Sequence, residues 1–333
     1  MPRVLLVALL LALAAPAAAT AAPYTAPGGK VLWGGQGGYK PGNILDFAKQ
    51  SGKAPAVYNY FIAWKGTDPA MHWLSFRLAD ARAHGARPML SIGAEGGDLS
   101  PAAIASGAGD TFLVRLGALL AEHGEPVYVR PLSEMNNGNN RYSAYDLSGH
   151  SRGPAYSTRQ FRRAWRRLAL ILRGGEVAGI DRELRRLRLP PVRTGAERLP
   201  RPKVALMWVP LSFGNPEIAK NHPRHWWPGG AYVDWVGTTW YSPFKASSAM
   251  HAIYSNPLWR DKPFAFAEWA VWGRDDPGFV RQFFGFMRAH RRVRMAVYYQ
   301  SAMLEPAFRL SSHPGTRRAL RQLVRWPRLA GAG

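Results

Sequence analysis

The sequence predicts an α/β fold made of a single (β/α)8 barrel, the TIM barrel. Eight short apolar segments alternate with segments of helical periodicity, which is the order of elements in such a barrel. The chain has 333 residues, 47% of them hydrophobic, enough for one barrel with a large core. A doubly wound sheet is the alternative. It usually carries a glycine-rich cofactor turn early in the chain, and the loop Gly34–Gly42 lacks both the dinucleotide spacing and a phosphate-loop ending.

The first half of the chain shows four strand-and-helix repeats. Runs of β-branched and aromatic residues predict the strands, and apolar residues at helical spacing predict the helices. In the second helix Trp73, Phe76, Leu78 and Ala81 share this spacing and are expected to face the core. The expected strands are Val31–Trp33, Ala56–Trp64, Arg87–Gly93 and Val127–Pro131. The expected helices are Ile44–Lys49, Met71–His84, Ala102–Ser106 and Thr111–His123.

The second half begins with a helix that Ser157 can cap and that runs to about Arg173. Residues 174–202 are rich in Arg, Gly and Pro. They are interpreted as an insertion rather than a linker between domains, because a strand follows at once. The expected strands are Lys203–Pro210, Asp234–Tyr241, Pro263–Trp269 and Val293–Gln300. The remaining expected helices are Asp181–Arg188, Ser248–Tyr254, Pro277–Ala289 and Gly315–Trp326.

Residues 1–21 are expected to form a secretory signal peptide. Arg3 precedes the apolar run Val4–Ala14, and small residues suited to cleavage follow. An uncleaved anchor is the alternative, but the run is too short to form a stable membrane span. Residues 22–333 are therefore expected to be one exported domain, extracellular or periplasmic, and monomeric. The chain has no cysteine, which excludes thiol chemistry and thiolate metal sites.

The chain carries 44 basic and 21 acidic residues, a formal net charge of +23. Such a field attracts polyanions, namely nucleic acid, anionic lipid or acidic polysaccharide. A solvated arginine-rich surface is the simpler interpretation, because the arginines lie mostly on helical segments. No nucleic-acid motif is present, so nucleic acid is not expected as a partner. A polysaccharide is the expected partner, and an acidic one stays among the candidates.

Few carboxylates follow the strands, where barrel enzymes place their chemistry. They are Glu95, Glu134, Glu268 and Glu305, whereas Asp234 begins a strand and belongs to the opposite end of the barrel. The strands before Glu134 and Glu268 come from opposite sides of the ring, so the two side chains are expected to face each other. Two facing carboxylates are what the cleavage of a glycosidic bond requires.

Structural roles are the alternatives for both glutamates. Glu134 could form a salt bridge with Arg130, and Glu268 could accept a hydrogen bond from Tyr241. Arg130 is also expected to lie deeper in the barrel and to keep a neighbouring carboxylate ionised. The strand positions of both glutamates together favour a catalytic pair over two unrelated structural contacts.

Aromatic side chains near the strand ends indicate a sugar cleft, because indole and phenol rings stack on pyranose faces. Filling the core is the alternative for some of them. Trp226 and Trp227 lie in a loop with His222 and His225 and suggest a further platform; two histidines are a weak metal signal, so no metal or cofactor is expected. The candidate aromatics are Trp64, Trp208, Trp240, Tyr241, Trp269 and Trp272.

These segments resemble glycoside hydrolase family 26, the β-mannanase family of the retaining (β/α)8 glycosidases. Arg130–Asn136 reads Arg-Pro-Leu-Ser-Glu-Met-Asn and is similar to the family segment Arg-x-x-His-Glu-Met-Asn-Gly. Residues 228–241 and 262–268 are similar to the strands that carry the family's conserved tyrosine and its nucleophile. The resemblance covers most of residues 22–333.

The resemblance implies a retaining endo-β-glycosidase similar to mannan endo-1,4-β-mannosidases. Glu134 corresponds to the acid/base, Glu268 to the nucleophile and Tyr241 to the tyrosine that contacts it. Ser133 and Asn136, beside Glu134, are expected to contact substrate, as is Arg130.

Three positions depart from the family pattern. Ser133, Asn137 and Asn139 stand where the family has histidine, glycine and tryptophan at the subsite next to the cleaved bond. The particular sugar therefore does not follow from the resemblance. A catalytically inactive polysaccharide-binding barrel is the second functional hypothesis, and a basic surface binder is the third.

Overall fold

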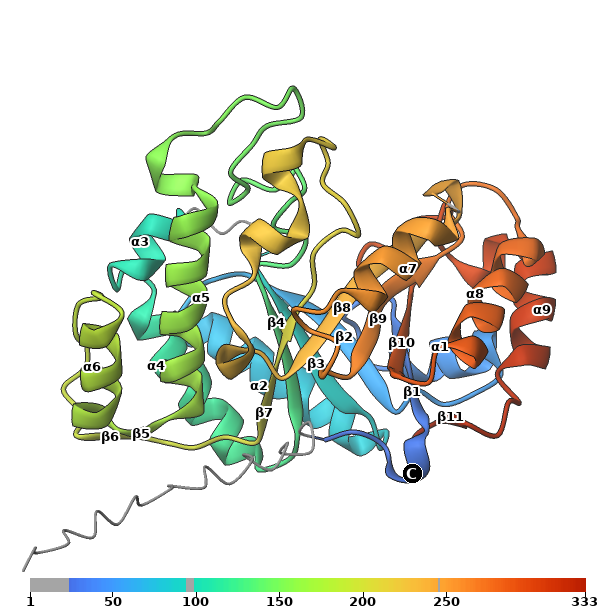
Figure 1. The fold of residues 1–333 in the computed structure, drawn as a ribbon. Helices are drawn as coiled ribbons and strands as arrows, with labels where there is room; N and C mark the ends of the chain where they lie inside the picture. Colours follow the sequence, from blue (N-terminus) through green and yellow to red (C-terminus); the bar gives the residue numbers. More distant parts are fainter. Residues whose placement is uncertain (1–23, 94–98, 245) are drawn as a thin grey trace, which may run out of the picture.

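The computed structural model describes residues 24–93, 99–244 and 246–333, so the expected signal peptide and Glu95 lie outside the described residues. Eight parallel strands form a barrel that closes where β1 pairs with β10, confirming the predicted (β/α)8 fold (Figure 1). The strands, in their order around the barrel, are β1 Val31–Gln36, β2 Val57–Ile62, β3 Arg87–Ile92, β4 Val127–Pro131, β7 Val204–Trp208, β8 Trp235–Tyr241, β9 Phe264–Ala270 and β10 Val293–Tyr299.

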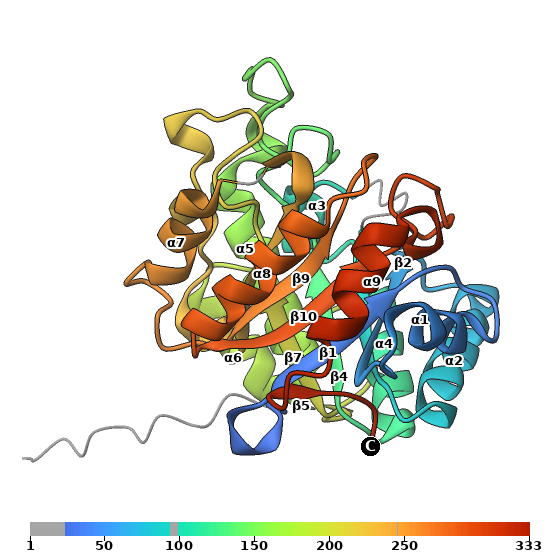
Figure 2. The same ribbon diagram turned by 90° about the vertical axis from the view of Figure 1, so that its right-hand side faces the viewer.

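Helices cover the outside of the barrel, as Figures 1 and 2 show from two sides. Ser157 caps α5 as predicted, since its hydroxyl accepts the Gln160 N–H at 3.3 Å. None of the described helices is both long and apolar enough to cross a membrane. The helices are α1 Asn43–Ser51, α2 Asp68–Ala83, α3 Pro101–Ala105, α4 Asp110–His123, α5 Thr158–Arg173, α6 Val177–Arg186, α7 Ser247–Ser255, α8 Pro277–Ala289 and α9 Pro314–Leu323.

The predicted insertion contains more regular structure than expected. The short strands β5 (Gly175–Glu176) and β6 (Arg198–Leu199) pair antiparallel and enclose α6. A third short strand, β11 (Leu329–Ala330), pairs in parallel with the beginning of β1. The last residues of the chain therefore lie at the end of the barrel where the strands begin.

Buried side chains form two layers, one inside the barrel and one between strands and helices. Tyr128, Met207 and Trp235 belong to the inner layer, while Trp33 and the apolar face of α5 belong to the outer one. Side chains on a strand alternate between these layers. The outer layer is apolar, whereas the strand faces of the inner layer also carry the buried polar side chains Asn59, Ser91 and Arg130.

One predicted helix face is wrong in part. In α2, Leu78 and Ala81 are buried as predicted, together with Leu74, whereas Trp73 and Phe76 are 65% and 54% exposed. The buried residues are separated by four and three positions, the spacing of one helical face. The smaller aliphatic side chains of α2, and not its large aromatic rings, make the contact with the core.

Candidate active site

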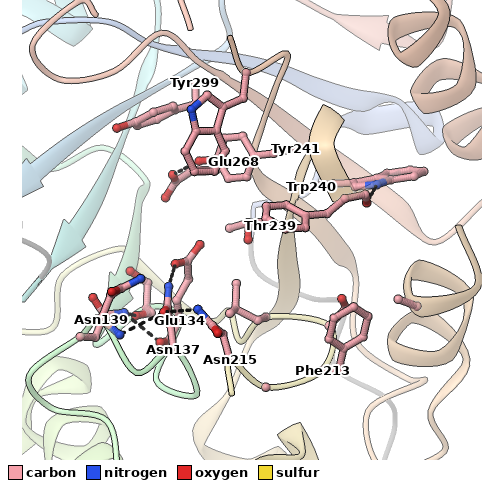
Figure 3. A pocket seen from close by; sticks show the side chains of 18 of the residues that line it. Glu134, Asn137, Asn139, Phe213, Asn215, Thr239, Trp240, Tyr241, Glu268 and Tyr299 are labelled. Atoms are coloured by element: carbon pink, nitrogen blue, oxygen red, sulfur yellow. Dashed lines mark hydrogen bonds between the residues drawn. The ribbon is translucent and has the colours of Figure 1, made fainter. Parts of the chain in front are cut away.

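A cavity of about 620 Å³ lies at the carboxyl-terminal ends of the barrel strands. The loops after β4 and β7 rise beside it and form one wall, and the ends of β8, β9 and β10 form the other (Figures 1 and 3). Glu134 comes from the first wall and Glu268 from the second (Figure 3). The structure thus brings together the two glutamates that the sequence suggested as a pair.

Glu268 reaches the cavity because β9 is irregular. The pairing with β8 runs from Thr238–Phe266 to Thr239–Glu268, so one extra residue of β9, Ala267, is accommodated there. Ala267 belongs to the inner layer and Glu268 lines the cavity, so two successive side chains point inward. Bulges of this kind often re-aim a side chain beside an active site.

Two groups hold the Glu268 carboxylate. The buried guanidinium of Arg130 donates from Nη1 to Oε1, and the Tyr241 hydroxyl donates to Oε2 at 2.7 Å. Burial raises the pKa of Tyr241 well above its usual value, so its hydroxyl keeps the proton that it donates. A neighbouring cation and a hydrogen-bond donor both favour an ionised carboxylate. Arg130 therefore pairs with Glu268 and not with Glu134, and it lies behind the cavity wall.

Glu134 is placed by a turn rather than by a continued strand. Leu132 and Glu134 have φ values of 47° and 50°, so the chain after β4 is no longer extended. Leu132 consequently packs into the outer layer, whereas in a regular strand it would share a face with Arg130 and Glu134. The turn brings the Glu134 carboxylate into the cavity, where it is partly exposed.

The surroundings of Glu134 favour its protonated form. Burial and the negative charge of Glu268 raise the pKa of Glu134, and these effects outweigh Arg130 and the hydrogen bonds from Asn137 and Thr239, which lower it. Glu268 has a direct cationic partner, and Glu134 has neutral donors. The cavity therefore holds one carboxyl suited to carry a proton and one that is ion-paired with a buried guanidinium.

Two predicted sugar contacts, Trp208 and Trp269, are wrong because the indoles lie in the core, and a third, Trp240, lines the cavity but is almost entirely buried. Trp208, Trp240 and Trp269 are 0%, 1% and 0% exposed. Trp269 stacks on Phe283 of α8 with ring centroids 3.7 Å apart, and Trp240 packs against four phenylalanines of the same layer. Trp208 and Trp269 support the cavity wall from outside. Trp240 and Tyr241 both line the cavity, as expected.

The other predicted aromatic contacts also separate into side chains that pack in the core and one that lines the cavity. Trp64 is partly buried against Phe112 of α4 and does not line the cavity. Trp226 is fully buried against Phe161, and Trp227 packs on Trp208, so the expected platform is part of the core. Trp272 is different. It lines the cavity and is 44% exposed, so it can offer its ring to a ligand.

Asn136 has a structural role in place of the expected substrate contact. It is fully buried, and its amide bonds Leu211 and Phe213 in the loop after β7: Nδ2 donates to their carbonyls at 3.1 and 2.7 Å, and Oδ1 accepts the Leu211 N–H at 2.8 Å. Asn136 thereby joins two loops that wall the cavity. Ser133 lines the cavity, although its carbonyl is already bonded by the Tyr142 hydroxyl at 2.5 Å.

Sequence reasoning missed Thr239 and the polar contacts of Asn137. Thr239 lies two residues before Tyr241 on β8, so both face the cavity, and its hydroxyl hydrogen-bonds Glu134. Strand β8 thus supplies a hydrogen-bond donor to each glutamate, Thr239 to Glu134 and Tyr241 to Glu268. The period-two spacing from Tyr241 was the signal that could have identified Thr239. Among the described residues no group of three or more His, Asp or Glu side chains is arranged to hold a metal ion.

Comparison with family models and with curated proteins gives no match, but solved structures share the fold. A GH26 β-mannanase from Bacteroides ovatus is 16% identical with a TM-score of 0.62, and 91% of each chain is covered. An endo-β-1,4-mannanase double mutant from Cellulomonas fimi is 19% identical with a TM-score of 0.62, covering 91% of this chain and 72% of that one. GH26A from a Muricauda species is 18% identical with a TM-score of 0.59, covering 91% and 92%. The chain therefore has a (β/α)8 barrel fold like that of glycoside hydrolase family 26.

Proposed function

We propose that this protein is a retaining endo-β-glycosidase that cleaves a β-linked polysaccharide. The observation that carries the proposal is the unequal environment of the two cavity carboxylates. Glu268 is ion-paired with Arg130 and accepts a hydrogen bond from Tyr241, whereas burial and Glu268 raise the pKa of Glu134. Double displacement needs such a division between an ionised nucleophile and a protonated acid.

In the first step Glu268 attacks the anomeric carbon while Glu134 protonates the leaving glycosidic oxygen. In the second step Glu134, now ionised, takes a proton from water as the water displaces Glu268 from the sugar. Once Glu268 is bonded to the sugar it no longer carries the negative charge that raises the pKa of Glu134, so Glu134 can act as a base. Tyr241 and Arg130 keep Glu268 oriented in the free enzyme and stabilise it again as the leaving carboxylate.

The cavity lining favours an uncharged glycan. Its described charged side chains are Glu134, Glu217 and Glu268, with no lysine or arginine among the described lining residues. The net charge of +23 therefore lies elsewhere on the molecule. An acidic polysaccharide would meet negative charge at the point of cleavage and so fits this site less well.

Aromatic rings on one wall suit the apolar face of a pyranose. Trp272 and Phe244 are 44% and 60% exposed at the cavity, and their ring centroids lie 6.2 Å apart. Neutral amides lie on the facing wall and can bond sugar hydroxyls. Endo action on β-1,4-mannan is what the names of the Cellulomonas fimi and Bacillus structures state for those proteins, and β-mannan is the first substrate to test here.

The test is a reducing-sugar assay over β-mannans, mixed-linkage β-glucans, xylans and acidic polysaccharides. Glu268→Ala should abolish turnover of any glycan that the unaltered protein cleaves. Asp261→Asn is the matched control, because Asp261 lies before β9 at the opposite end of the barrel and is largely exposed. Proton NMR of the first-formed product should show the anomer of the substrate, since double displacement retains configuration.

Glu134→Ala separates the two roles further. On aryl glycosides whose phenolate leaves without protonation it should retain the first step, seen as a burst of released phenolate, and then turn over slowly because the second step lacks the base that takes the proton from water; hydrolysis of natural glycans should be lost. A polysaccharide-binding barrel without activity would show binding that Glu268→Ala leaves unchanged and no reducing ends from any glycan. That pair of results would refute the proposed function. Export through residues 1–21 stays a prediction, tested by N-terminal sequencing of secreted protein.

A further inference from the structure

Asn137 contacts the carboxylate of Glu134 directly. Its Nδ2 donates to Glu134 Oε2 at 3.0 Å, across one short turn after β4. Its Oδ1 accepts two hydrogen bonds, from the Asn139 backbone N–H and from Asn215 Nδ2, both at 3.2 Å. Figure 3 shows this amide between the two loops, pointing toward Glu134.

The orientation of the Asn137 amide follows from its partners. A backbone N–H can only donate, so the atom of Asn137 that meets Asn139 N–H must be the oxygen. The nitrogen is then left facing Glu134. The contact with the carboxylate is therefore a donation, which orients the carboxylate and favours its ionised form.

The backbone around Asn137 is also fixed. Its N–H donates to the Glu134 carbonyl at 2.9 Å, and the next residue, Gly138, donates to the Asn215 carbonyl at 2.5 Å. Asn137 and Asn215 form an isolated parallel bridge between the loops after β4 and β7. The amide is thus held from two loops, and its position relative to Glu134 does not depend on its own rotamer preference alone.

We propose that Asn137, oriented by Asn215, is a positioning residue that holds the Glu134 carboxylate and stabilises its ionised form. This rests on the proposed function, in which Glu134 must alternate between acid and base. The ionised form is the one that accepts a proton from water in the second step. Asn137 therefore opposes the raising of the Glu134 pKa by burial and by Glu268, and keeps the base role accessible.

Several other titratable groups face Glu134 and act in the same balance. They come from different elements and also affect the pKa of Glu134. The variants must therefore leave these groups unchanged, so that a change in the Glu134 pKa can be assigned to Asn137. The groups are Glu268 of β9, Arg130 of β4, Tyr142 of the loop after β4, Tyr241 of β8 and Tyr299 of β10. None of them lies on the turn that carries Asn137 except Tyr142, which bonds the Ser133 carbonyl.

The first test compares pH profiles of kcat/KM on the best glycan. Asn137→Gly should move the alkaline limb, which reports loss of the Glu134 proton, to higher pH by about one unit. Asn215→Ala should move it the same way but less, because one of two anchors of the Asn137 oxygen remains. Asn139→Ala is the control for the position of the limb only: Asn139 supplies its backbone N–H to this network, but its side chain lines the cavity, so the height of the profile can change while the limb should not move.

The second test does not depend on activity. The Glu134 carboxyl is titrated by carbon-13 NMR in glutamate-labelled protein, with Glu134→Gln used to assign the signal. The same upward shift in Asn137→Gly supports positioning even if no glycan is cleaved, in which case only the proposed function fails. An unmoved limb together with an unmoved titration, in variants whose unfolding temperature matches the unaltered protein, overturns the proposal. If Asn137→Gly does not fold, Asn215→Ala decides by the same two readouts.

Discussion

Replacing Arg130 tests whether the buried ion pair exists for catalysis or for stability. Arg130 is fully buried, and the Glu268 side chain is 8% exposed. Only Nη1 of the guanidinium contacts Glu268, and Nε and Nη2 have no hydrogen-bond partner among the described residues. Such unpartnered buried donors keep their desolvation cost. We therefore expect the pair as a whole to add little to the free energy of unfolding.

The magnitudes follow from this geometry. Arg130→Met leaves the Glu268 carboxylate buried without a cation, and breaking a buried pair in this way costs about 3–5 kcal/mol of unfolding free energy. The Tyr241 hydroxyl still donates to that carboxylate at 2.7 Å, so the lower end of the range is expected. Arg130→Met combined with Glu268→Gln removes both charges, and it should be as stable as the unaltered protein or more stable, by up to about 4 kcal/mol.

The assay is urea unfolding of the four proteins of this double-mutant cycle at neutral pH, followed by tryptophan fluorescence. The dependence of the free energy of unfolding on urea concentration must have the same slope in all four proteins, so that differences in the unfolding midpoint report differences in free energy. The double variant should be inactive while being at least as stable as the unaltered protein. A double variant that is as unstable as Arg130→Met alone would refute the reasoning, because the pair would then stabilise the fold through more than its charges.

Three further predictions concern single side chains. Tyr241→Phe removes a hydrogen bond to a charged group, worth about 1.5–3 kcal/mol, so kcat should fall roughly 10- to 150-fold in steady-state assays; an unchanged kcat would show that Glu268 needs no donor there. Trp272→Ala should raise KM with little change in unfolding free energy, whereas Trp269→Ala should cost about 3–5 kcal/mol in denaturation, because only Trp269 is buried; equal losses of stability would contradict this placement. Glu134→Gln should stabilise the protein at pH 7 and not at pH 3. The raised pKa of Glu134 means that the folded state disfavours its charged form, a cost present above the folded pKa and absent once both states are protonated; the same gain at both pH values would exclude this origin.

The barrel was predictable because its signal repeats along the whole chain. Each strand is a short apolar run and each helix has its own periodicity, so an error at one boundary does not alter the architecture. The pairing of Glu134 with Glu268 followed from this architecture, since Glu134 comes just after β4 and Glu268 lies near the carboxyl-terminal end of β9. Their unequal surroundings did not follow, because these depend on contacts across the barrel such as Arg130 with Glu268.

Trp208 and Trp269 were mispredicted although the sequence contained the relevant signal. Trp269 follows Glu268, so if the glutamate faces the cavity its neighbour must point outward. A position near the end of a strand is therefore not sufficient for a sugar contact, because the side chain must also lie on the strand face that points to the cavity. The bulge at Ala267 is different in kind. It depends on pairing with two neighbouring strands and leaves no mark in the local sequence.

The placement of the chain terminus has a practical consequence for working with this protein on solid supports. Ala332 donates its N–H to the Ala54 carbonyl at 3.2 Å, and β11 pairs with the first residues of β1. Figure 1 shows this end of the barrel opposite the carboxyl-terminal ends of the strands, where the cavity lies. A bead, tag or surface coupled after Gly333 would leave the carboxylates facing the bulk solution. Immobilised protein should then keep its cavity open to soluble polymers.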